Sequence, residues 1–204
     1  MGHNVAESCR LMLVTDDRLV EGRDLVALCL AAERGGATAV QLRLKSASPR
    51  ELVALARRLI AVLTVPLLLN DRPDVALAAG AAGVHLGPDD LPVPLVRKLA
   101  PPEFLIGASV GSEGEAGPAA GASYWGIGPW RETATKNDAG AGLGLEGFAR
   151  LVRLAGGRPC VAIGSITPSD VPLVRSVGGA GVAVASGILG AEDVEAAARA
   201  YREK

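Results

Sequence analysis

Residues 65–90 read VPLLLNDRPDVALAAGAAGVHLGPDD, and the rest of the chain repeats the unit that they define. The apolar run at residues 65–69 is typical of a strand that is buried on both faces. Pro73 suits the first turn of a short helix, and glycines then mark the return to a second strand at residues 83–86. A strand, a helix and a strand in this order predict two parallel strands whose carboxyl ends lie side by side.

An acidic side chain follows each of these strands, Asp71 after the first and Asp90 after the second. On parallel neighbouring strands the two carboxylates would converge at one edge of the sheet. Carboxylate oxygens are ligands that Mg²⁺ prefers, and Mg²⁺ often carries the phosphates of a substrate. Each Asp taken alone also fits an ordinary turn or a helix N-cap. The magnesium interpretation therefore depends on whether the rest of the chain has the same layout.

The alternation of strand and helix continues along the whole chain. Strands are expected at residues 11–14, 39–42, 65–69, 83–86, 104–106, 124–128, 160–163 and 181–185. Helices are expected at residues 24–34, from Ser48 to Leu63, from Pro73, at residues 92–99, 112–120 and 145–154, from Thr167, and at residues 191–202. Eight such units in 204 residues predict a single (β/α)₈ TIM barrel over residues 1–204, with residues 1–10 as a flexible leader. An open doubly wound sheet is the alternative.

The composition limits the classes of function. Apolar residues make up 49% and charged residues 21% of the chain, as in globular domains. A net charge of −1 and an aromatic content of 3% do not favour binding to nucleic acid or to an anionic membrane. The sequence contains no signal peptide and no span of membrane length, so a cytoplasmic location is expected. Self-association into a homo-oligomer stays open.

Chemically useful residues follow most of the predicted strands, at the end where TIM barrels place their active sites. These residues are Gln41, Arg43, Lys45, Asn70, Ser109, Thr133, Thr135, Lys136, Gly164 and Ser186. Gln41, Arg43 and Lys45 alternate along one strand and its extension, so all three are expected to point into the mouth. Arg and Lys neutralise phosphate charge, whereas glycine and serine after the last two strands allow backbone N–H groups to face an anion. The pattern predicts two anion sites.

Two other signals are interpreted as structural. Residues 107–111, GASVG, match the G-x-S-x-G elbow of serine hydrolases, but no histidine follows Ser109 to complete a triad. His85 lies between Val84 and Leu86 within a predicted strand, so it is expected to be a structural histidine. Neither feature is assigned a catalytic role.

Several segments together resemble the thiamine phosphate synthase family. They are LVTD at residues 13–16, VQLRLK at 40–45, residues 67–92, GIGPWRETATK at 126–136, VAIGSITP at 161–168 and GVAVASGI at 181–188. The resemblance implies a TIM-barrel transferase that joins a pyrimidine diphosphate to a thiazole phosphate and releases pyrophosphate. It implies that Asp71 and Asp90 hold Mg²⁺, and that both substrates are phosphorylated small molecules. It also implies roles for the remaining residues. Gln41, Arg43, Lys45, Asn70, Ser109 and Lys136 would bind the pyrimidine diphosphate, and Thr133, Thr135, Gly164, Ala185 and Ser186 would hold the thiazole phosphate. Arg43, Lys45, Ser109 and Lys136 would act on the leaving group.

The chain departs from the family pattern at two places near the predicted phosphate site. Residues 130–132, WRE, replace a more usual apolar–aromatic–proline stretch, and Ser165 replaces a glycine. Two alternative functions stay open. The related thiazole tautomerases resemble the chain less, because they carry a histidine where this chain has Gly111. A non-catalytic barrel that binds a thiamine precursor would not need the acidic and basic residues that the chain retains.

Overall fold

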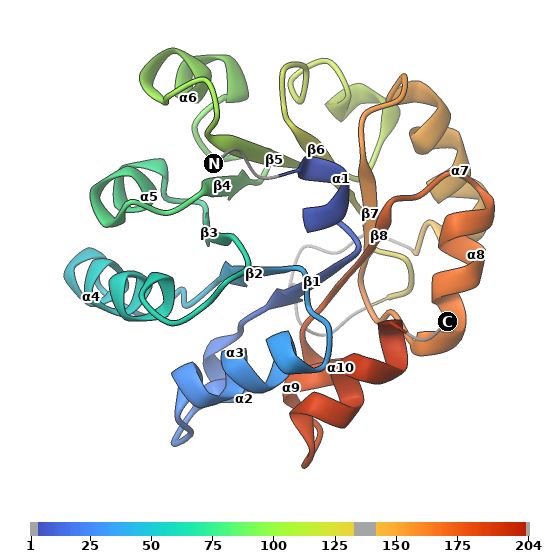
Figure 1. Ribbon diagram of the computed structural model, residues 1–204. Helices are drawn as coiled ribbons and strands as arrows, with labels where there is room; N and C mark the ends of the chain where they lie inside the picture. Colours follow the sequence, from blue (N-terminus) through green and yellow to red (C-terminus); the bar gives the residue numbers. More distant parts are fainter. Residues whose placement is uncertain (1–3, 133–141, 203–204) are drawn as a thin grey trace.

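The structure, a computed structural model, describes residues 4–132 and 142–202 and has a closed barrel of eight parallel strands at its centre (Figure 1). The strands are β1 (Leu11–Val14), β2 (Ala39–Leu42), β3 (Leu67–Asn70), β4 (Gly83–Leu86), β5 (Leu105–Val110), β6 (Tyr124–Ile127), β7 (Cys160–Ile163) and β8 (Gly181–Val184). Each strand pairs with the next, and β8 closes on β1 with Val184 aligned to Leu13. All eight predicted strands are present, and the predicted (β/α)₈ barrel is confirmed.

Helices form a ring around the barrel (Figure 1). The longer ones are α3 (Leu25–Arg34), α4 (Pro49–Ile60), α5 (Pro73–Ala79), α6 (Val93–Leu99), α7 (Gly144–Leu154), α8 (Val171–Ser176) and α10 (Val194–Arg202). Local sequence explains where they begin and end. A capping box starts α4, because the Glu51 N–H donates to Ser48 Oγ and the Ser48 N–H donates to the Glu51 carboxylate. Gly80 ends α5 in the left-handed conformation that glycine adopts at low cost.

The prediction of a helix over residues 112–120 is wrong. That segment contains only a 3₁₀ turn, η1 (Glu113–Glu115), followed by turns. Pro118 and the glycines in this stretch disfavour a longer helix. The sequence also did not indicate two short helices at the carboxyl ends of strands, α2 (Asp17–Val20) and α9 (Ser186–Leu189); a second 3₁₀ turn, η2 (Pro168–Asp170), leads into α8.

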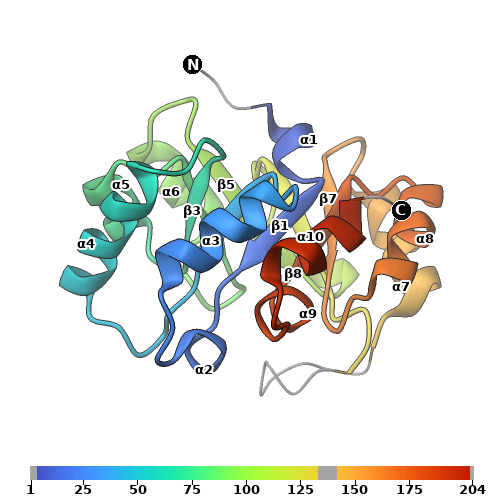
Figure 2. The ribbon, with the colours of Figure 1, turned by 60° about the horizontal axis from the view of Figure 1, so that its bottom comes forward.

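Residues 4–10 differ from the flexible leader that the sequence predicted. Val5–Ser8 form helix α1, whose first N–H groups donate to the side chain of Asn4. The side chain of Val5 packs against the cluster inside the barrel, and Cys9 is 1% exposed. The apolar contact explains why this segment is fixed, and α1 lies at the end of the barrel opposite to α2 and α9 (Figure 2).

The core has two shells. The outer shell lies between the strands and the helices, whereas the inner one fills the interior of the barrel on the α1 side. Members of the inner shell include Met12, Leu68, Leu105, Tyr124 and Val161, each at most 5% exposed. The interior on the α1 side is therefore packed, and the carboxyl ends of the strands are the place where TIM barrels bind their ligands. Within the described residues, no helix has the length and apolar character needed to cross a membrane.

Candidate active site

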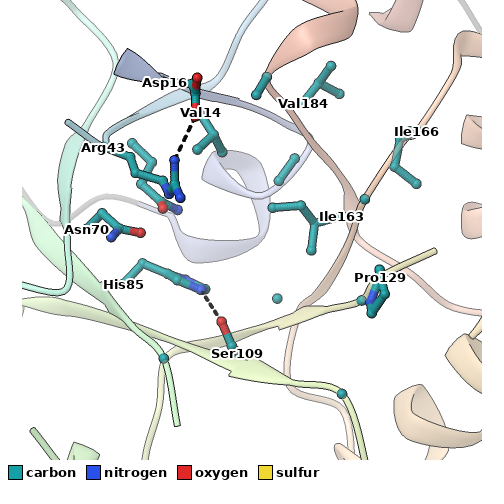
Figure 3. A pocket seen from close by; sticks show the side chains of 18 of the residues that line it. Val14, Asp16, Arg43, Asn70, His85, Ser109, Pro129, Ile163, Ile166 and Val184 are labelled. Carbon is teal, nitrogen blue, oxygen red and sulfur yellow. Dashed lines mark hydrogen bonds and ion pairs between the residues drawn. The ribbon is translucent and has the colours of Figure 1, made fainter. Parts of the chain in front are cut away.

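A cavity of about 380 Å³ opens at the carboxyl ends of the strands (Figure 3). It has the size that small-molecule sites commonly have. The predicted site residues that line it are Gln41, Arg43, Lys45, Asn70, Asp71, Ser109, Gly164, Ala185 and Ser186. Asp90 lies next to Asp71 at its edge. Thr133, Thr135 and Lys136 lie outside the described residues, so their predicted roles stay predictions.

The end of β1 holds the basic end of β2 in place. The Thr15 hydroxyl, which is fully buried, accepts the Arg43 N–H at 2.7 Å and donates to the Arg43 carbonyl at 3.1 Å. Asp16 then forms an ion pair with the Arg43 guanidinium, with 2.8 Å between Oδ2 and Nη1 (Figure 3). Both side chains are less than one-fifth exposed, so solvent weakens this pair less than a surface pair. Arg43 is thereby fixed in the wall of the cavity.

Asp71 and Asp90 converge as the sequence predicted. Asp71 has a φ of 64°, and its N–H donates to the carbonyl of His85, which ties β3 to β4 beyond the end of the strand. Lys45 Nζ lies 3.1 Å from Asp71 Oδ2, and Asp90 accepts the Gly87 N–H at 2.6 Å. Burial and the adjacent Asp71 carboxylate raise the pKa of Asp90 to about 6, although the Gly87 N–H and Lys45 oppose that rise.

The acidic pair fits a divalent cation. Two neighbouring carboxylates repel each other, as the raised pKa of Asp90 reflects, and a cation between them would relieve that repulsion. Among residues 4–132 and 142–202, no three His, Cys, Asp or Glu side chains cluster as a set of ligands. Protein oxygens would therefore supply only part of the shell of a Mg²⁺ ion, and water and substrate phosphates would supply the rest. That division is common for Mg²⁺ in enzymes that act on phosphorylated substrates.

His85 takes part in the cavity wall, although the sequence predicted a structural histidine. Its Nε2 lies 3.0 Å from Ser109 Oγ (Figure 3), and its Nδ1 lies 3.0 Å from the hydroxyl of the buried Tyr124. Gly107 makes this arrangement possible, because a Cβ atom there would lie 2.2 Å from the Tyr124 ring and 2.5 Å from His85 Nδ1. The chain Tyr124–His85–Ser109 fixes the Ser109 hydroxyl at the cavity surface.

The opposite side of the cavity is formed mainly by backbone. Gly164 and Ser165 both have positive φ, 102° and 51°, directly after β7. Their turn faces Ser186 and Gly187, the first residues of α9. Within the described part of the chain, the backbone N–H groups of Ser165, Ile166, Ser186 and Gly187 have no hydrogen-bond acceptor. Unpaired N–H groups around one cavity bind an anion such as a phosphate. We call residues 164–166 and 185–187 the cup.

Apolar side chains separate the two sides of the cavity. Val14 and Ile163 project toward its centre (Figure 3). They provide a surface for uncharged rings between a charged side and an anion-binding side. A ligand with two anionic groups joined through flat rings would complement this layout.

Sequence reasoning missed two residues that hold the predicted ones, Asp16 and His85. The signal for His85 was its pairing, because it is the strand neighbour of Asn70, and aligned residues on parallel strands point to the same side. The signal for Asp16 was its position directly beyond β1, beside the basic end of β2. Both could have been found by applying the strand alternation to every strand rather than to β2 alone.

Comparisons with known proteins agree with this geometry. The sequence profile of the family described as thiamine monophosphate synthase matches residues 11–188. A thiamine-phosphate synthase from Syntrophomonas wolfei is 44% identical over 198 residues, which is 95% of this chain and 94% of that protein. One from Methanoculleus marisnigri is 45% identical over 199 residues, again 95% and 94%.

A solved structure gives the same result. The thiamine phosphate pyrophosphorylase from Pyrococcus furiosus superposes with a TM-score of 0.86 at 38% identity, covering 98% of this chain and 96% of that one. The barrel of 3-hexulose-6-phosphate synthase, at 18% identity and a TM-score of 0.71, shares the fold alone. Matches of this extent over nearly the whole chain show that the protein belongs to the thiamine monophosphate synthase family.

Proposed function

We propose that the chain joins 4-amino-5-hydroxymethyl-2-methylpyrimidine diphosphate to thiazole phosphate, which gives thiamine phosphate and pyrophosphate. Membership of the family makes it a transferase of thiamine biosynthesis. The observation that carries the proposal is the single cavity with two unlike anion-binding sides, since the reaction brings together one diphosphate and one monophosphate. The alternative function, thiazole tautomerase, is disfavoured because this chain has Gly111 where those enzymes carry a histidine.

The charged side of the cavity would hold the diphosphate. Arg43 and Lys45 are the cations there, and Asn70 and Ser109 add hydrogen-bonding groups. Lys136 belongs to the same proposed set on the strength of the sequence. Asp71 and Asp90 would hold Mg²⁺, which when bound neutralises charge on the diphosphate. Gln41 is 4% exposed and lies two residues before Arg43, within β2 and deeper in the barrel. An amide at this depth can pair with the edge of an aminopyrimidine.

The thiazole phosphate would bind on the other side. The free N–H groups of the cup, together with the Ser186 hydroxyl, would take its phosphate, with Ala185 leaving room for the group. Thr133 and Thr135 belong to this proposed set from the sequence. The thiazole ring would then lie against Val14 and Ile163, close to the pyrimidine.

The bonding changes need no nucleophile from the protein. The bond between the pyrimidine methylene carbon and the diphosphate oxygen breaks, and its electron pair leaves with pyrophosphate. The electron-rich aminopyrimidine stabilises the resulting cation, and the lone pair of the thiazole nitrogen forms the new carbon–nitrogen bond. Arg43, Lys45 and the Ser109 hydroxyl stabilise the leaving charge, while the cavity wall aligns the rings. This explains why the site is rich in cations and hydrogen-bond donors.

A coupled assay of pyrophosphate release tests the proposal. The purified protein is given both substrates, with Mg²⁺ or with a chelator, and thiamine phosphate is quantified at the same time. We expect release that needs both substrates and Mg²⁺, with one thiamine phosphate formed per pyrophosphate. Binding of thiazole phosphate without any release would contradict the proposal and favour a tautomerase or a binding protein. The cytoplasmic location and the homo-oligomer stay predictions.

A further inference from the structure

The segment that leaves β6 lies along the segment that leaves β7. The Trp130 N–H donates to the Ile163 carbonyl at 2.7 Å, and the Arg131 N–H donates to the Gly164 carbonyl at 3.2 Å. Gly164 is the point of closest approach, because a Cβ atom there would lie 2.9 Å from the Cα of Pro129. The backbone of the cup is therefore supported from the β6 side, beside Pro129 and Ile163 in Figure 3.

The side chain of Arg131 adds a second and stronger connection. Nη1 and Nη2 of its guanidinium donate to the two carboxylate oxygens of Asp170 at 2.7 and 2.6 Å. Nη1 also donates to the carbonyl of Ser165 at 2.9 Å. Two parallel charge-assisted hydrogen bonds fix direction as well as distance. Arg131 thus joins the β6 segment to the cup and to the start of α8.

Asp170 is a buried anchor for this connection. The residue is 2% exposed, and it also accepts the N–H and the hydroxyl of Thr167, both at 2.7 Å. Burial alone would raise the pKa of Asp170, but the hydrogen bonds from Arg131 and Thr167 outweigh burial and lower it to about 2. The carboxylate is ionised at neutral pH and holds Arg131 and the turn before α8 at once.

The residue that Arg131 holds has an unfavourable backbone conformation. Ser165 has a φ of 51°, which residues with a Cβ atom adopt only when their surroundings enforce it. Arg131 binds the carbonyl of Ser165, and the Ser165 hydroxyl donates to the Glu132 carbonyl at 3.1 Å. The Ile166 N–H, which has no acceptor within the described residues, belongs to the same planar peptide group as the Ser165 carbonyl. The contacts of residues 131–132 therefore set the direction of a cup N–H group.

We propose that Arg131 and Asp170 are positioning residues that set the affinity of the cup for thiazole phosphate. The inference rests on the proposed function, because that function assigns the phosphate to the cup. Arg131 would act on the phosphate through the cup, since its Nη1 and Nη2 donate to Asp170 and to the Ser165 carbonyl. Residues 130–132 and Ser165, which both depart from the family pattern near the predicted phosphate site, are then parts of one structure.

The test compares four variants by isothermal titration with thiazole phosphate and by steady-state kinetics. They are Arg131→Gln, Arg131→Lys, Asp170→Asn and the double variant Arg131→Gln/Asp170→Asn. The matched control is Arg150→Gln, which breaks an ion pair with Glu113 at 3.0 Å between exposed side chains that do not line the cavity. Melting temperatures are recorded for all five proteins. Arg131→Lys keeps a charge and a donor, so it serves if Arg131→Gln does not fold.

We expect Arg131→Gln to raise the Kd and KM for thiazole phosphate by about tenfold, the loss of one good charge-assisted contact. Arg131→Lys should lie between wild type and Arg131→Gln, because a single ammonium cannot make the two parallel bonds. The double variant should bind thiazole phosphate no more weakly than the more impaired of the two single variants, since both single substitutions remove the same interaction. The KM for the pyrimidine diphosphate should stay within about twofold, as should every constant of Arg150→Gln.

An unchanged Kd for thiazole phosphate in Arg131→Gln or in Arg131→Lys would overturn the inference. So would equal losses for both substrates, which would indicate a general structural role. The titration needs no turnover, so it separates the two proposals. Wild-type protein that binds thiazole phosphate but releases no pyrophosphate would refute the function alone. Wild-type protein that does not bind thiazole phosphate would refute both.

Discussion

The β2–β4 side of the cavity presents charged side chains, whereas the β7–β8 side presents backbone N–H groups. Arg43, Lys45, Asp71 and Asp90 meet on the first side, and the turn after β7 faces the start of α9 on the second. Charged side chains can adjust their positions when a diphosphate leaves or when a cation binds and dissociates. Backbone N–H groups are fixed by the fold and suit a phosphate that does not react. The two sides thus match a reacting and a non-reacting anion.

The pKa values of Asp90 and Asp170 make the difference between the two sides of the cavity measurable. The pKa of Asp90 is raised to about 6, mainly by burial and with the help of Asp71, whereas hydrogen bonds lower the pKa of Asp170 to about 2 despite its burial. The protein groups around Asp90 do not fully compensate the cost of ionising this partly buried carboxyl group. Asp170 is compensated by Arg131 and Thr167. The β2–β4 side therefore keeps an uncompensated negative charge, which a bound metal and a substrate would compensate, while the charges on the cup side are paired within the protein.

The largest effect should come from the acidic pair. Asp71→Asn or Asp90→Asn should lower Mg²⁺-dependent kcat/KM by about 100-fold or more, because each removes a charged group that is proposed to hold the ion. The coupled assay across a Mg²⁺ titration measures this loss, and circular dichroism checks that the barrel persists. Asp89→Asn is the control, since Asp89 is exposed and next to Asp90 in sequence. Full turnover in both variants would refute the metal assignment and with it the contrast between the sides.

The cup should respond to a change in backbone. Gly164→Ala places a Cβ atom 2.9 Å from the Cα of Pro129 at a residue with φ of 102°. We expect the KM for thiazole phosphate to rise by roughly tenfold and the free energy of unfolding to fall by about 1–3 kcal/mol. Gly156→Ala provides the comparison, because Gly156 also has positive φ but nothing lies near its Cβ position. If the two variants bind thiazole phosphate equally well, the close approach has no functional effect.

A smaller effect is expected from the support of Arg43. Asp16→Asn keeps a hydrogen-bond acceptor but removes the charge that fixes the guanidinium at 2.8 Å. The KM for the pyrimidine diphosphate should rise by about threefold to tenfold, with the KM for thiazole phosphate unchanged. Asp74→Asn is a suitable control because it breaks an ion pair between Asp74 and Arg72. Neither of these residues lines the cavity. A selective loss of thiazole phosphate binding would show that Asp16 supports the cup and not the charged side of the cavity, which would contradict this prediction.

The smallest effect concerns stability. The pKa of folded Asp90, about 6, lies above the ordinary 3.8, so the metal-free fold should lose stability as pH rises from about 4 to 6. The pKa of folded Asp170, about 2, lies below 3.8, so its contribution is present above about pH 4 and is lost as pH falls toward 2.

At pH 7.5 without metal, Asp90→Asn should therefore raise the melting temperature and Asp170→Asn should lower it. The expected changes are about 2–4 °C in each direction for a chain of this size. Thermal melts of both variants beside wild type, at pH 4 and pH 7.5, test this directly. Shifts of the same sign at pH 7.5 would remove the contrast between the two carboxylates.

The sequence predicted the barrel and most of the cavity because both depend on local patterns. The alternation at Gln41, Arg43 and Lys45 determines the side to which each points, and parallel strands bring Asp71 to Asp90 without further information. The resemblance added the chemical roles, which the pattern alone could not supply.

Two other parts were not predicted, one because it depends on a contact between distant segments and one because competing local signals were misjudged. Arg131 and Asp170 are 39 residues apart and lie on different connections, so nothing local relates them. Residues 112–120 contain the polar start that favours a helix, yet the Glu115 carboxylate accepts the Gly111 N–H, and the segment turns instead. A tertiary contact decided the first case, whereas local features, the Glu115–Gly111 contact together with Pro118 and the glycines, decided the second.

The placement of α1 has a practical consequence. The helix α1 lies at the end of the barrel opposite to α2 and α9 (Figure 2), and the barrel interior beside it is packed, so α1 is separated from the cavity by that packed layer. An affinity tag, a surface anchor or a fluorescent fusion joined through the amino-terminal side would lie away from the mouth of the cavity. Protein immobilised in this way should keep its mouth open to solution, which suits surface-based titration of both substrates.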